Sequence, residues 1–124
     1  MKIKTIEGKD YLRIHDKQTP YTLIGNISYF MADGGYTHIF FNKNKEVVER
    51  VLLKKCENLL SNFGFIRINH NILVNTKHIT GFVVGTKEKK CFIREIELNF
   101  SRRRFDFLME AGMLPPLMTK TNHL

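Results

Sequence analysis

Most of the chain consists of short runs of β-branched and aromatic residues, separated by polar stretches rich in Gly, Asn and Lys. Such runs are typical of β-strands joined by tight turns. A strong turn signal, Asp33-Gly34-Gly35, precedes the run at 36–41, and a polar turn at 42–45 follows it, so 36–50 is expected to form a hairpin. The pattern predicts about nine short strands, including those at 11–14, 21–24, 27–30, 36–41, 65–68, 72–74, 79–84 and 91–96.

One segment in the middle of the chain has helical spacing instead. Its apolar positions are Val48, Val51, Leu52, Leu59 and Leu60, and its polar face contains Lys54, Lys55, Glu57 and Asn58. Gly64 provides a C-terminal stop for this helix. The start of the helix is ambiguous, because Val47-Val48 is also good strand sequence.

A second, short helix is expected over 101–111. Ser101 is a suitable N-cap, and Gly112 is a suitable stop. The side facing the core is expected to contain Phe105, Leu108 and Met109. The proline pair at 115–116 would end any helix, so the folded domain is expected to span 1–110, with a flexible tail over 111–124.

Length and composition limit the class of protein. The 124 residues are 43% hydrophobic and 26% charged, which is ordinary for one folded domain and too apolar for a disordered chain. Cys56 and Cys91 are too few for a disulfide scaffold and lack the paired spacing of a zinc ribbon, so two free thiols are expected. Neither a membrane span of ~20 apolar residues nor a secretory signal is present. The sequence predicts a cytoplasmic protein without membrane association.

Motifs for catalysis are missing from the sequence. There is no Gly-x-Ser-x-Gly elbow and no phosphate-binding glycine loop, and the acidic residues are scattered. The histidines do not pair at the spacing of zinc ligands; they are His15, His38, His70, His78 and His123. We therefore expect no enzymatic activity, no metal and no cofactor.

Positive charge is in excess and is concentrated towards the C-terminal end. The formal net charge is +8, which favours a polyanionic partner, most often nucleic acid. Arg102-Arg103-Arg104 opens the second helix, where cations oppose the helix dipole unless an anion binds. A phosphate would suit both the guanidinium groups and the free backbone N–H groups there. The alternative is a solvated basic turn paired with Glu95 or Glu97.

A second polar cluster interrupts the strand pattern. The alternation typical of a strand places Ile68, Ile72 and Val74 on one face. Asn69-His70-Asn71, three consecutive polar residues, interrupts this alternation. Amide and imidazole side chains on a loop can read base edges; Asn is the usual partner of adenine, and an arginine such as Arg67 that of guanine. An ordinary turn stabilised by Asn side chains has the same composition, so the cluster alone leaves both interpretations open.

Four motifs, in this order, resemble the LytTR-type DNA-binding domain of bacterial transcriptional regulators. The first is Ile27-Ser28-Tyr29-Phe30-Met31-Ala32-Asp33-Gly34-Gly35-Tyr36, and the second is the helical Leu53-Lys54-Lys55-Cys56-Glu57-Asn58-Leu59-Leu60. The third is Phe65-Ile66-Arg67-Ile68-Asn69-His70-Asn71-Ile72-Leu73-Val74-Asn75 with Ile79, and the last is Phe100-Ser101-Arg102-Arg103-Arg104. The resemblance covers residues 5–110.

This resemblance implies a mainly β fold, an elongated domain of small antiparallel sheets with one or two short helices. It assigns 46–50 to a strand and moves the start of the first helix towards Val51. In the family, loops from one edge enter successive major grooves of bent DNA. By motif position, the DNA contacts would come from Tyr36, Thr37, His38, Arg67, Asn69, His70, Asn71, Arg102, Arg103 and Arg104.

One motif position departs from the family. His70 stands where the family often has Arg, and an imidazole is neutral or only partly charged near pH 7. The bases read by this loop therefore do not follow from the resemblance. No receiver domain precedes the motifs in these 124 residues, so a stand-alone member is expected.

We interpret the chain as a sequence-specific transcriptional regulator that binds double-stranded DNA. Two copies of the chain are expected on each direct-repeat site, as a homodimer. The main alternative is a non-catalytic protein-interaction module that antagonises or partners a DNA-bound relative. An RNA-binding β-domain is a third interpretation, but the paired aromatic residues of common RNA-binding sheets are missing.

Overall fold

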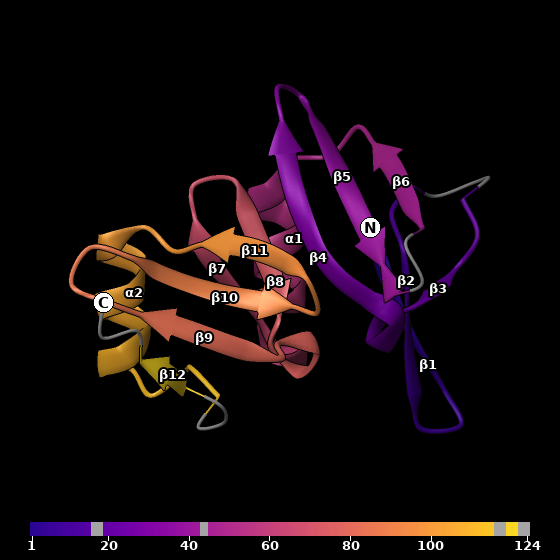
Figure 1. Ribbon diagram of the computed structural model, residues 1–124. Helices are drawn as coiled ribbons and strands as arrows, with labels where there is room; N and C mark the ends of the chain where they lie inside the picture. The colour runs from indigo at the N-terminus through magenta and orange to yellow at the C-terminus, as the bar shows by residue number, and fades with distance from the viewer. Residues whose placement is uncertain (16–18, 43–44, 116–118, 122–124) are drawn as a thin grey trace.

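A computed structural model describes residues 1–15, 19–42, 45–115 and 119–121, which form three β-sheets and two α-helices (Figure 1). The N-terminal sheet contains β1 (Lys2–Ile6), β2 (Lys9–Arg13) and β3 (Thr22–Leu23). The central sheet contains, in spatial order, β6 (Glu46–Glu49), β5 (Tyr36–Phe41), β4 (Ile27–Asp33), β8 (Ile72–Asn75) and β7 (Phe65–Asn69). The C-terminal sheet contains β11 (Ile96–Asn99), β10 (Lys89–Ile93), β9 (Gly81–Val84) and β12 (Thr119–Thr121).

These strands confirm the predicted mainly β fold. Neighbouring strands are antiparallel except for β12, which runs parallel to β9. The helices are α1 (Leu53–Leu60) and α2 (Arg102–Glu110). The three sheets follow one another along an elongated molecule, with the N-terminal hairpin at one end and α2 at the other (Figure 1).

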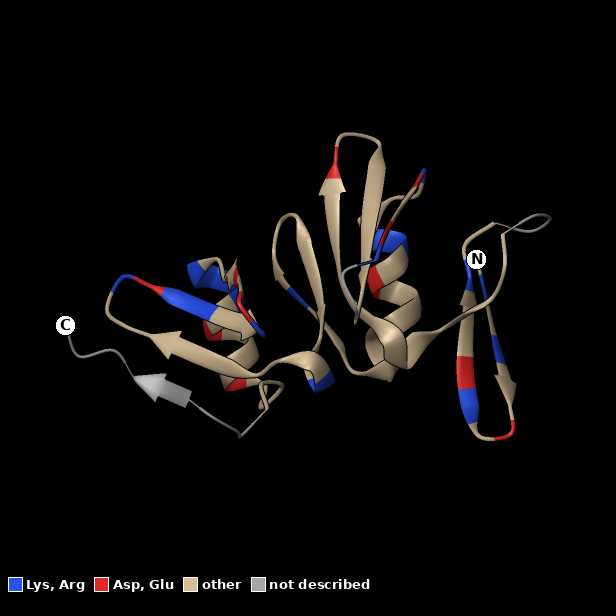
Figure 2. Cartoon of the chain, turned by 45° about the vertical axis from the view of Figure 1, so that its right-hand side comes forward, with Lys and Arg blue, Asp and Glu red and all other residues tan. Residues whose placement is uncertain are grey.

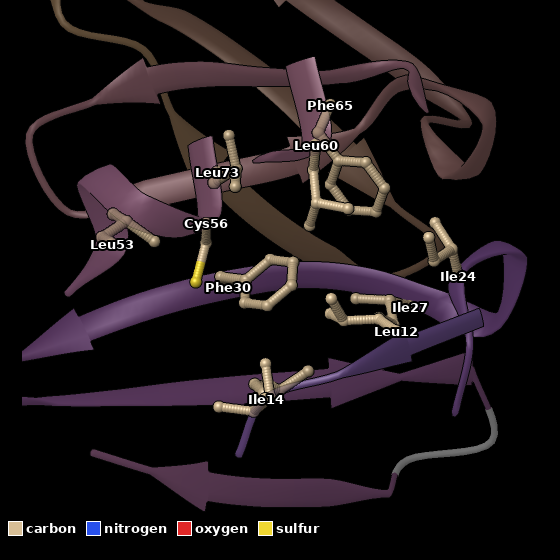
Figure 3. Packing of buried hydrophobic residues seen from close by; sticks show 11 residues of the cluster. Leu12, Ile14, Ile24, Ile27, Phe30, Leu53, Cys56, Leu60, Phe65 and Leu73 are labelled. Atoms are coloured by element: carbon tan, nitrogen blue, oxygen red, sulfur yellow. The ribbon is translucent and has the colours of Figure 1, made fainter. Parts of the chain in front are cut away.

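In the middle of the central sheet, at β4 and β8, consecutive residues are buried although they point to opposite faces, so both faces are covered there. Phe30 and Leu73 pack into one core with α1 and the N-terminal sheet (Figure 3). Tyr29 is the chain neighbour of Phe30, and Val74 is the neighbour of Leu73. Both pack on the other face, in a second core with α2 and the C-terminal sheet. The central sheet therefore connects the two ends of the molecule into one packed unit.

Helix α1 begins at Leu53, directly after a short connection from β6. Its buried residues are Leu53, Cys56 and Leu60, which share one face. The strand assignment for 46–50 is confirmed by β6, whereas helical spacing beginning at Val48 was misleading, because Val48 is exposed in the edge strand. Gly64, with a φ of 86°, ends the helical segment after one 3-10 turn, as predicted.

Helix α2 confirms the predicted second helix and its cap. The Ser101 hydroxyl accepts a hydrogen bond from the Arg104 N–H at 3.2 Å, and Gly112 adopts a φ of 66° at the C-terminal end. Phe105 and Leu108 are buried, but the prediction for Met109 is wrong, since its side chain is 57% exposed. Only a narrow stripe of this short terminal helix touches the sheet, and Met109 lies about 100° around the axis from Leu108.

The single strand expected over 91–96 is also wrong. Arg94 and Glu95 form a turn between β10 and β11, with Arg94 at a φ of 56°. This turn has no Gly, Asn or Pro to mark it, so pairing between the two strands specifies it instead. Strand β1 was not predicted either, and it pairs with β2 along its whole length.

Parts of two predicted segments lie outside the described residues. These are 43–44 in the polar turn at 42–45, and 116–118 and 122–124 in the tail expected to be flexible. Within that tail, Thr119–Thr121 form β12 beside β9. No helix in the described part of the chain is long and apolar enough to cross a membrane.

Candidate nucleic-acid interface

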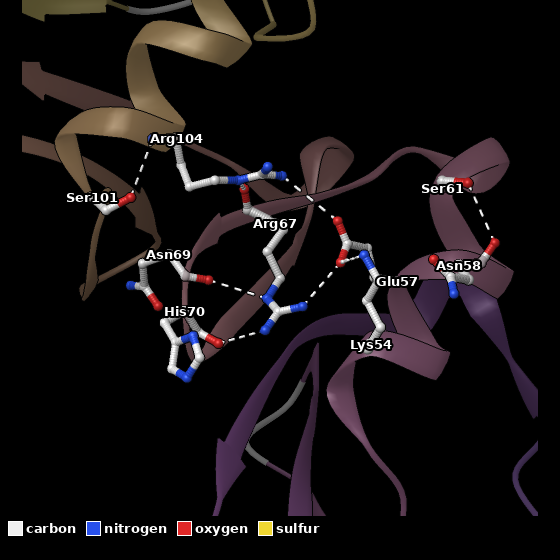
Figure 4. Close-up of polar contacts among 9 residues, drawn as sticks. All are labelled: Lys54, Glu57, Asn58, Ser61, Arg67, Asn69, His70, Ser101 and Arg104. Atoms are coloured by element: carbon white, nitrogen blue, oxygen red, sulfur yellow. Dashed lines mark hydrogen bonds and ion pairs between the residues drawn. The ribbon is translucent and has the colours of Figure 1, made fainter.

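The β7–β8 turn and the N-terminus of α2 lie side by side (Figure 4). The Ser101 N–H donates a hydrogen bond to the Ile68 carbonyl at 3.0 Å, and Arg104 Nε donates to the Arg67 carbonyl at 2.9 Å. The two polar clusters found in the sequence are therefore held on the same side of the molecule, although more than thirty positions separate them in the chain.

Asn69 builds the turn rather than extending from it. Its Oδ1 accepts a hydrogen bond from the Asn71 N–H at 2.7 Å, and its Nδ2 donates to the Asn99 carbonyl at 2.6 Å. The ladder between β7 and β8 shifts register before Asn69, so His70 and Asn71 form a two-residue tip. Both tip residues are exposed, and neither side chain forms a hydrogen bond to any described residue. The turn interpretation therefore holds for Asn69, whereas the side chains of His70 and Asn71 are left as candidates for contact with a ligand.

Arg67 lies beneath the tip and is only 16% exposed. Its Nη1 donates to Glu57 Oε1 at 2.9 Å. Its Nε and Nη2 donate to the carbonyls of Asn69 and His70 at 3.2 and 2.6 Å. In this conformation Arg67 is positioned to support the turn, with its donors directed at the protein.

The three arginines of α2 have different environments. Arg102 and Arg103 are exposed, and neither forms an ion pair within the described chain. Arg104 is half-buried, with its guanidinium carbon 5.2 Å from the Phe107 ring centroid. No described contact joins the triplet to Glu95 or Glu97, and Glu97 instead pairs with Lys90 at 3.1 Å. The first turn of α2 also has no acidic residue.

Glu57 is a residue whose role the sequence did not reveal. Its Oε1 accepts from Arg67, and its Oε2 lies 3.6 Å from Arg104 Nη2, so one carboxylate connects α1 with both elements of the candidate interface (Figure 4). The helical pattern placed Glu57 only on the polar face of α1. Its position in the second motif was the signal that could have identified it.

The β4–β5 turn adds a neighbouring surface. The Ala32 N–H donates to the Asn71 carbonyl at 2.8 Å, which places this turn against the β7–β8 turn. Tyr36 is 50% exposed there and lines a shallow groove together with His70, Asn71 and Lys54. Lys54, 71% exposed at the start of α1, is a further cation of this surface, and its place in the sequence motif gave no sign of this position.

Thr37 cannot reach a ligand in this conformation, although motif position had assigned it a DNA contact. Alternation along β5 turns Thr37 away from Tyr36 and His38, and its side chain is fully buried. Its hydroxyl donates to the Val51 carbonyl at 2.6 Å. Thr37 therefore connects β5 to the segment that leads into α1.

His38 lies between two carboxylates. Its Nδ1 is hydrogen-bonded to Glu46, and its Nε2 is 3.5 Å from Asp33 Oδ2. The hydrogen bond to Glu46, together with the negative charges of Glu46 and Asp33, raises the pKa of His38 above its ordinary value. Both ring nitrogens of His38 therefore contact carboxylates of the protein, whereas the side chains of His70 and Asn71 at the β7–β8 tip form no such contact.

Comparison with known proteins identifies the family and the fold. Residues 17–113 match the family model of the LytTr DNA-binding domain. The structure is similar to the LytTr DNA-binding domain of a Bacillus cereus protein described as a methyl-accepting/DNA response regulator, with a TM-score of 0.68 and 14% identity. That similarity covers 81% of this chain and 94% of the other, and it concerns the fold. No curated protein matches the chain. Because the family model spans most of the sequence, the chain belongs to the LytTr DNA-binding domain family.

Proposed function

We propose that this chain is a sequence-specific transcriptional regulator that binds double-stranded DNA with the β7–β8 turn and the N-terminus of α2. The observation that carries the proposal is the 3.0 Å hydrogen bond from Ser101 N–H to the Ile68 carbonyl, which holds these two elements together. His70 and Asn71 are exposed on one side of this bond, and Arg102 and Arg103 are exposed on the other. Membership of a DNA-binding family supports DNA as the partner.

Base recognition is assigned to the tip of the β7–β8 turn. A two-residue tip is narrow compared with a major groove about 12 Å wide. The exposed carboxamide of Asn71 has an NH2 group that can donate to N7 of adenine and a carbonyl oxygen that can accept from its N6 amino group. His70 offers an imidazole next to it, which can donate or accept according to its tautomer.

Phosphate binding is assigned to the N-terminus of α2. The exposed Arg102 and Arg103 guanidinium groups and the helix N–H groups are all hydrogen-bond donors to an anion. Such contacts fix the position of the protein on DNA and add a salt-dependent contribution to affinity. Tyr36 and Lys54 extend the same surface along the β4–β5 turn. Bound to bent DNA, these elements would occupy successive major grooves.

Selection from a random duplex library tests this function. We expect one enriched sequence, bound about 1000-fold or more tightly than random duplex, with an affinity that decreases steeply as KCl is raised. Two shifted species on a site with two half-sites would support two copies on direct repeats. Failure to enrich any sequence, or equal binding to double-stranded RNA, would contradict the proposal.

A non-catalytic protein-interaction module is the second candidate. The observation in its favour is that α2 exposes two large apolar side chains, Phe107 and Met109. Contact with another protein commonly covers exposed apolar surface, and these two side chains are the apolar groups of α2 that such a contact would cover. A salt-sensitive, sequence-selective gel shift by the isolated chain supports the regulator, whereas its absence together with tight binding to a DNA-bound relative supports the module.

A further inference from the structure

The outer face of the N-terminal sheet carries a row of cations. The register pairs Lys2 with Arg13, Lys4 with Tyr11, and Ile6 with Lys9. Paired residues share a face of a sheet, and alternate residues of a strand return to it, so all six lie on one face. The opposite face points Leu12 into the core. Basic residues accordingly follow both strands of this hairpin (Figure 2).

This face is electrostatically uncompensated within the described part of the chain. Asp10 lies on the opposite face, where the Thr5 hydroxyl donates to its Oδ1 at 2.6 Å. None of the four cations on the outer face forms an ion pair with a described residue. Lys2 and Arg13 are directly opposite each other, and like charges in that arrangement destabilise a sheet. A bound polyanion would remove this repulsion.

A tyrosine organises the cations. The ring centroid of Tyr21 is 5.0 Å from Lys4 Nζ and 4.8 Å from the guanidinium carbon of Arg13. Arg13 Nε is buried and has no hydrogen-bond partner among the described residues. Stacking on an aromatic ring holds a guanidinium group in place and leaves its outer donors available for an anion.

The hairpin is separate from the turns assigned to DNA recognition. It lies at one end of the molecule, and α2 lies at the other (Figures 1 and 2). It also precedes residue 17, where the match to the family model begins. On the outer face of β1 and β2, no residue is an Asn or Gln that could read a base edge.

We propose that this outer face is a second DNA-contact surface, which binds the phosphate backbone of the duplex flanking the recognised sequence. The inference rests on the proposed function, because the turns and α2 bring the duplex to the protein. Lys and Arg bind phosphate through charge without reading sequence, which suits a face that has cations and tyrosines and no amide groups. The hairpin would thus add affinity and lengthen the DNA footprint.

Two duplexes and two double variants test this surface. Both duplexes contain the selected site; one ends at its boundaries, and the other continues for about one helical turn, ~10 base pairs, on each side. Lys2→Gln/Lys4→Gln removes two exposed cations from the hairpin. Lys45→Gln/Lys87→Gln removes the same charge from exposed positions outside the N-terminal sheet and is the matched control. The Kd of each pair is measured by fluorescence anisotropy over a range of KCl concentrations.

We expect the unsubstituted chain to bind the long duplex more tightly than the short one. Lys2→Gln/Lys4→Gln should weaken binding to the long duplex roughly tenfold and reduce the slope of log affinity against log salt by about 1.8, since each phosphate contact contributes about 0.9. Its binding to the short duplex should stay unchanged. The control should preserve the difference between the duplexes.

Equal effects of the hairpin variant on both duplexes, or no effect on either, would overturn the inference. No effect on either duplex is the result expected if the cations of the hairpin bind an acidic protein instead of DNA. A circular-dichroism melt checks that both variants remain folded. If the unsubstituted chain bound the short duplex without sequence preference, the proposed function would fail instead. The comparison of the two double variants on the long duplex would still decide whether the hairpin holds phosphates.

Discussion

The carboxylate of Glu57 lies 2.9 Å from Nη1 of Arg67 and connects helix α1 to the β7–β8 turn. Arg67 in turn donates to the carbonyls of Asn69 and His70, so this ion pair supports the shape of the turn that carries the exposed tip. The other carboxylate oxygen is 3.6 Å from Arg104. The conformation of the candidate interface therefore depends on a side chain that belongs to neither of its two elements.

Replacement of this carboxylate should lower the stability of the folded protein. Glu57→Ala leaves the half-buried guanidinium of Arg67 without its acidic partner, and we expect the free energy of unfolding to decrease by about 1–3 kcal/mol. Urea denaturation measures this loss. Lys54→Ala is the control, because Lys54 is exposed and 3.8 Å from the same carboxylate, so its change should stay below about 0.5 kcal/mol. Equal effects of the two substitutions would contradict the role of Glu57.

Arg103 is expected to contribute to DNA binding and little to stability. It is exposed at the N-terminus of α2, and Arg103→Ala should weaken binding to the selected site by about 1–3 kcal/mol. A gel-shift titration measures the affinity, and Lys87→Ala, an exposed cation outside the candidate interface, provides the comparison. Unchanged affinity of Arg103→Ala would reject the assigned role.

The cap of α2 should contribute measurably to stability. Ser101 Oγ accepts from Arg104 N–H at 3.2 Å, and Ser101→Ala should lower the free energy of unfolding by about 1 kcal/mol, because one helix N–H loses its partner. Ser61→Ala is a matched control, since the Ser61 hydroxyl is exposed and its hydrogen bond to the Asn58 carbonyl is long, at 3.4 Å. A Ser101 variant as stable as the Ser61 variant would show that the cap is dispensable.

His38 should make stability depend on pH. Its pKa is raised in the folded protein, chiefly by the hydrogen bond to Glu46, so the protonated form is stabilised by folding. The contribution is fully present below the unfolded pKa of about 6.5 and is lost as the pH rises through the higher folded pKa. His38→Gln should therefore destabilise the protein more at about pH 6 than at about pH 9.

Urea midpoints at the two pH values measure this difference. Glu46→Gln removes the main cause of the raised pKa and should reduce the same pH dependence. An equal loss of stability for His38→Gln at both pH values would mean that the imidazole contributes only as a neutral packing group.

Both cysteines should be unreactive in the folded protein. Cys56 and Cys91 are buried, and burial raises the pKa of each thiol to about 12. Since the thiolate is the reactive form, both should react slowly with Ellman's reagent at pH 8 and rapidly after unfolding in guanidinium chloride. Rapid reaction of either thiol before unfolding would contradict the burial.

The sequence by itself determined the elements whose signals are local. The turn after β4 depends on Asp33-Gly34-Gly35, and the start of α2 depends on the Ser101 cap, so neighbouring residues were sufficient to predict both. The order of the four motifs also indicated the family, which residues 17–113 confirm. The residue types of the polar clusters were visible, but the partner of each side chain was not.

Only the tertiary structure decided which polar residues support the interface and which are exposed on it. Arg67 and Asn69 became supports because Glu57 and Asn99 come within hydrogen-bond distance across 10 and 30 positions of the chain. Thr37 became a core residue because β5 packs against the segment before α1. The physical reason is that such bonds form only after distant strands and helices pack together, so a pattern read along the chain cannot specify them.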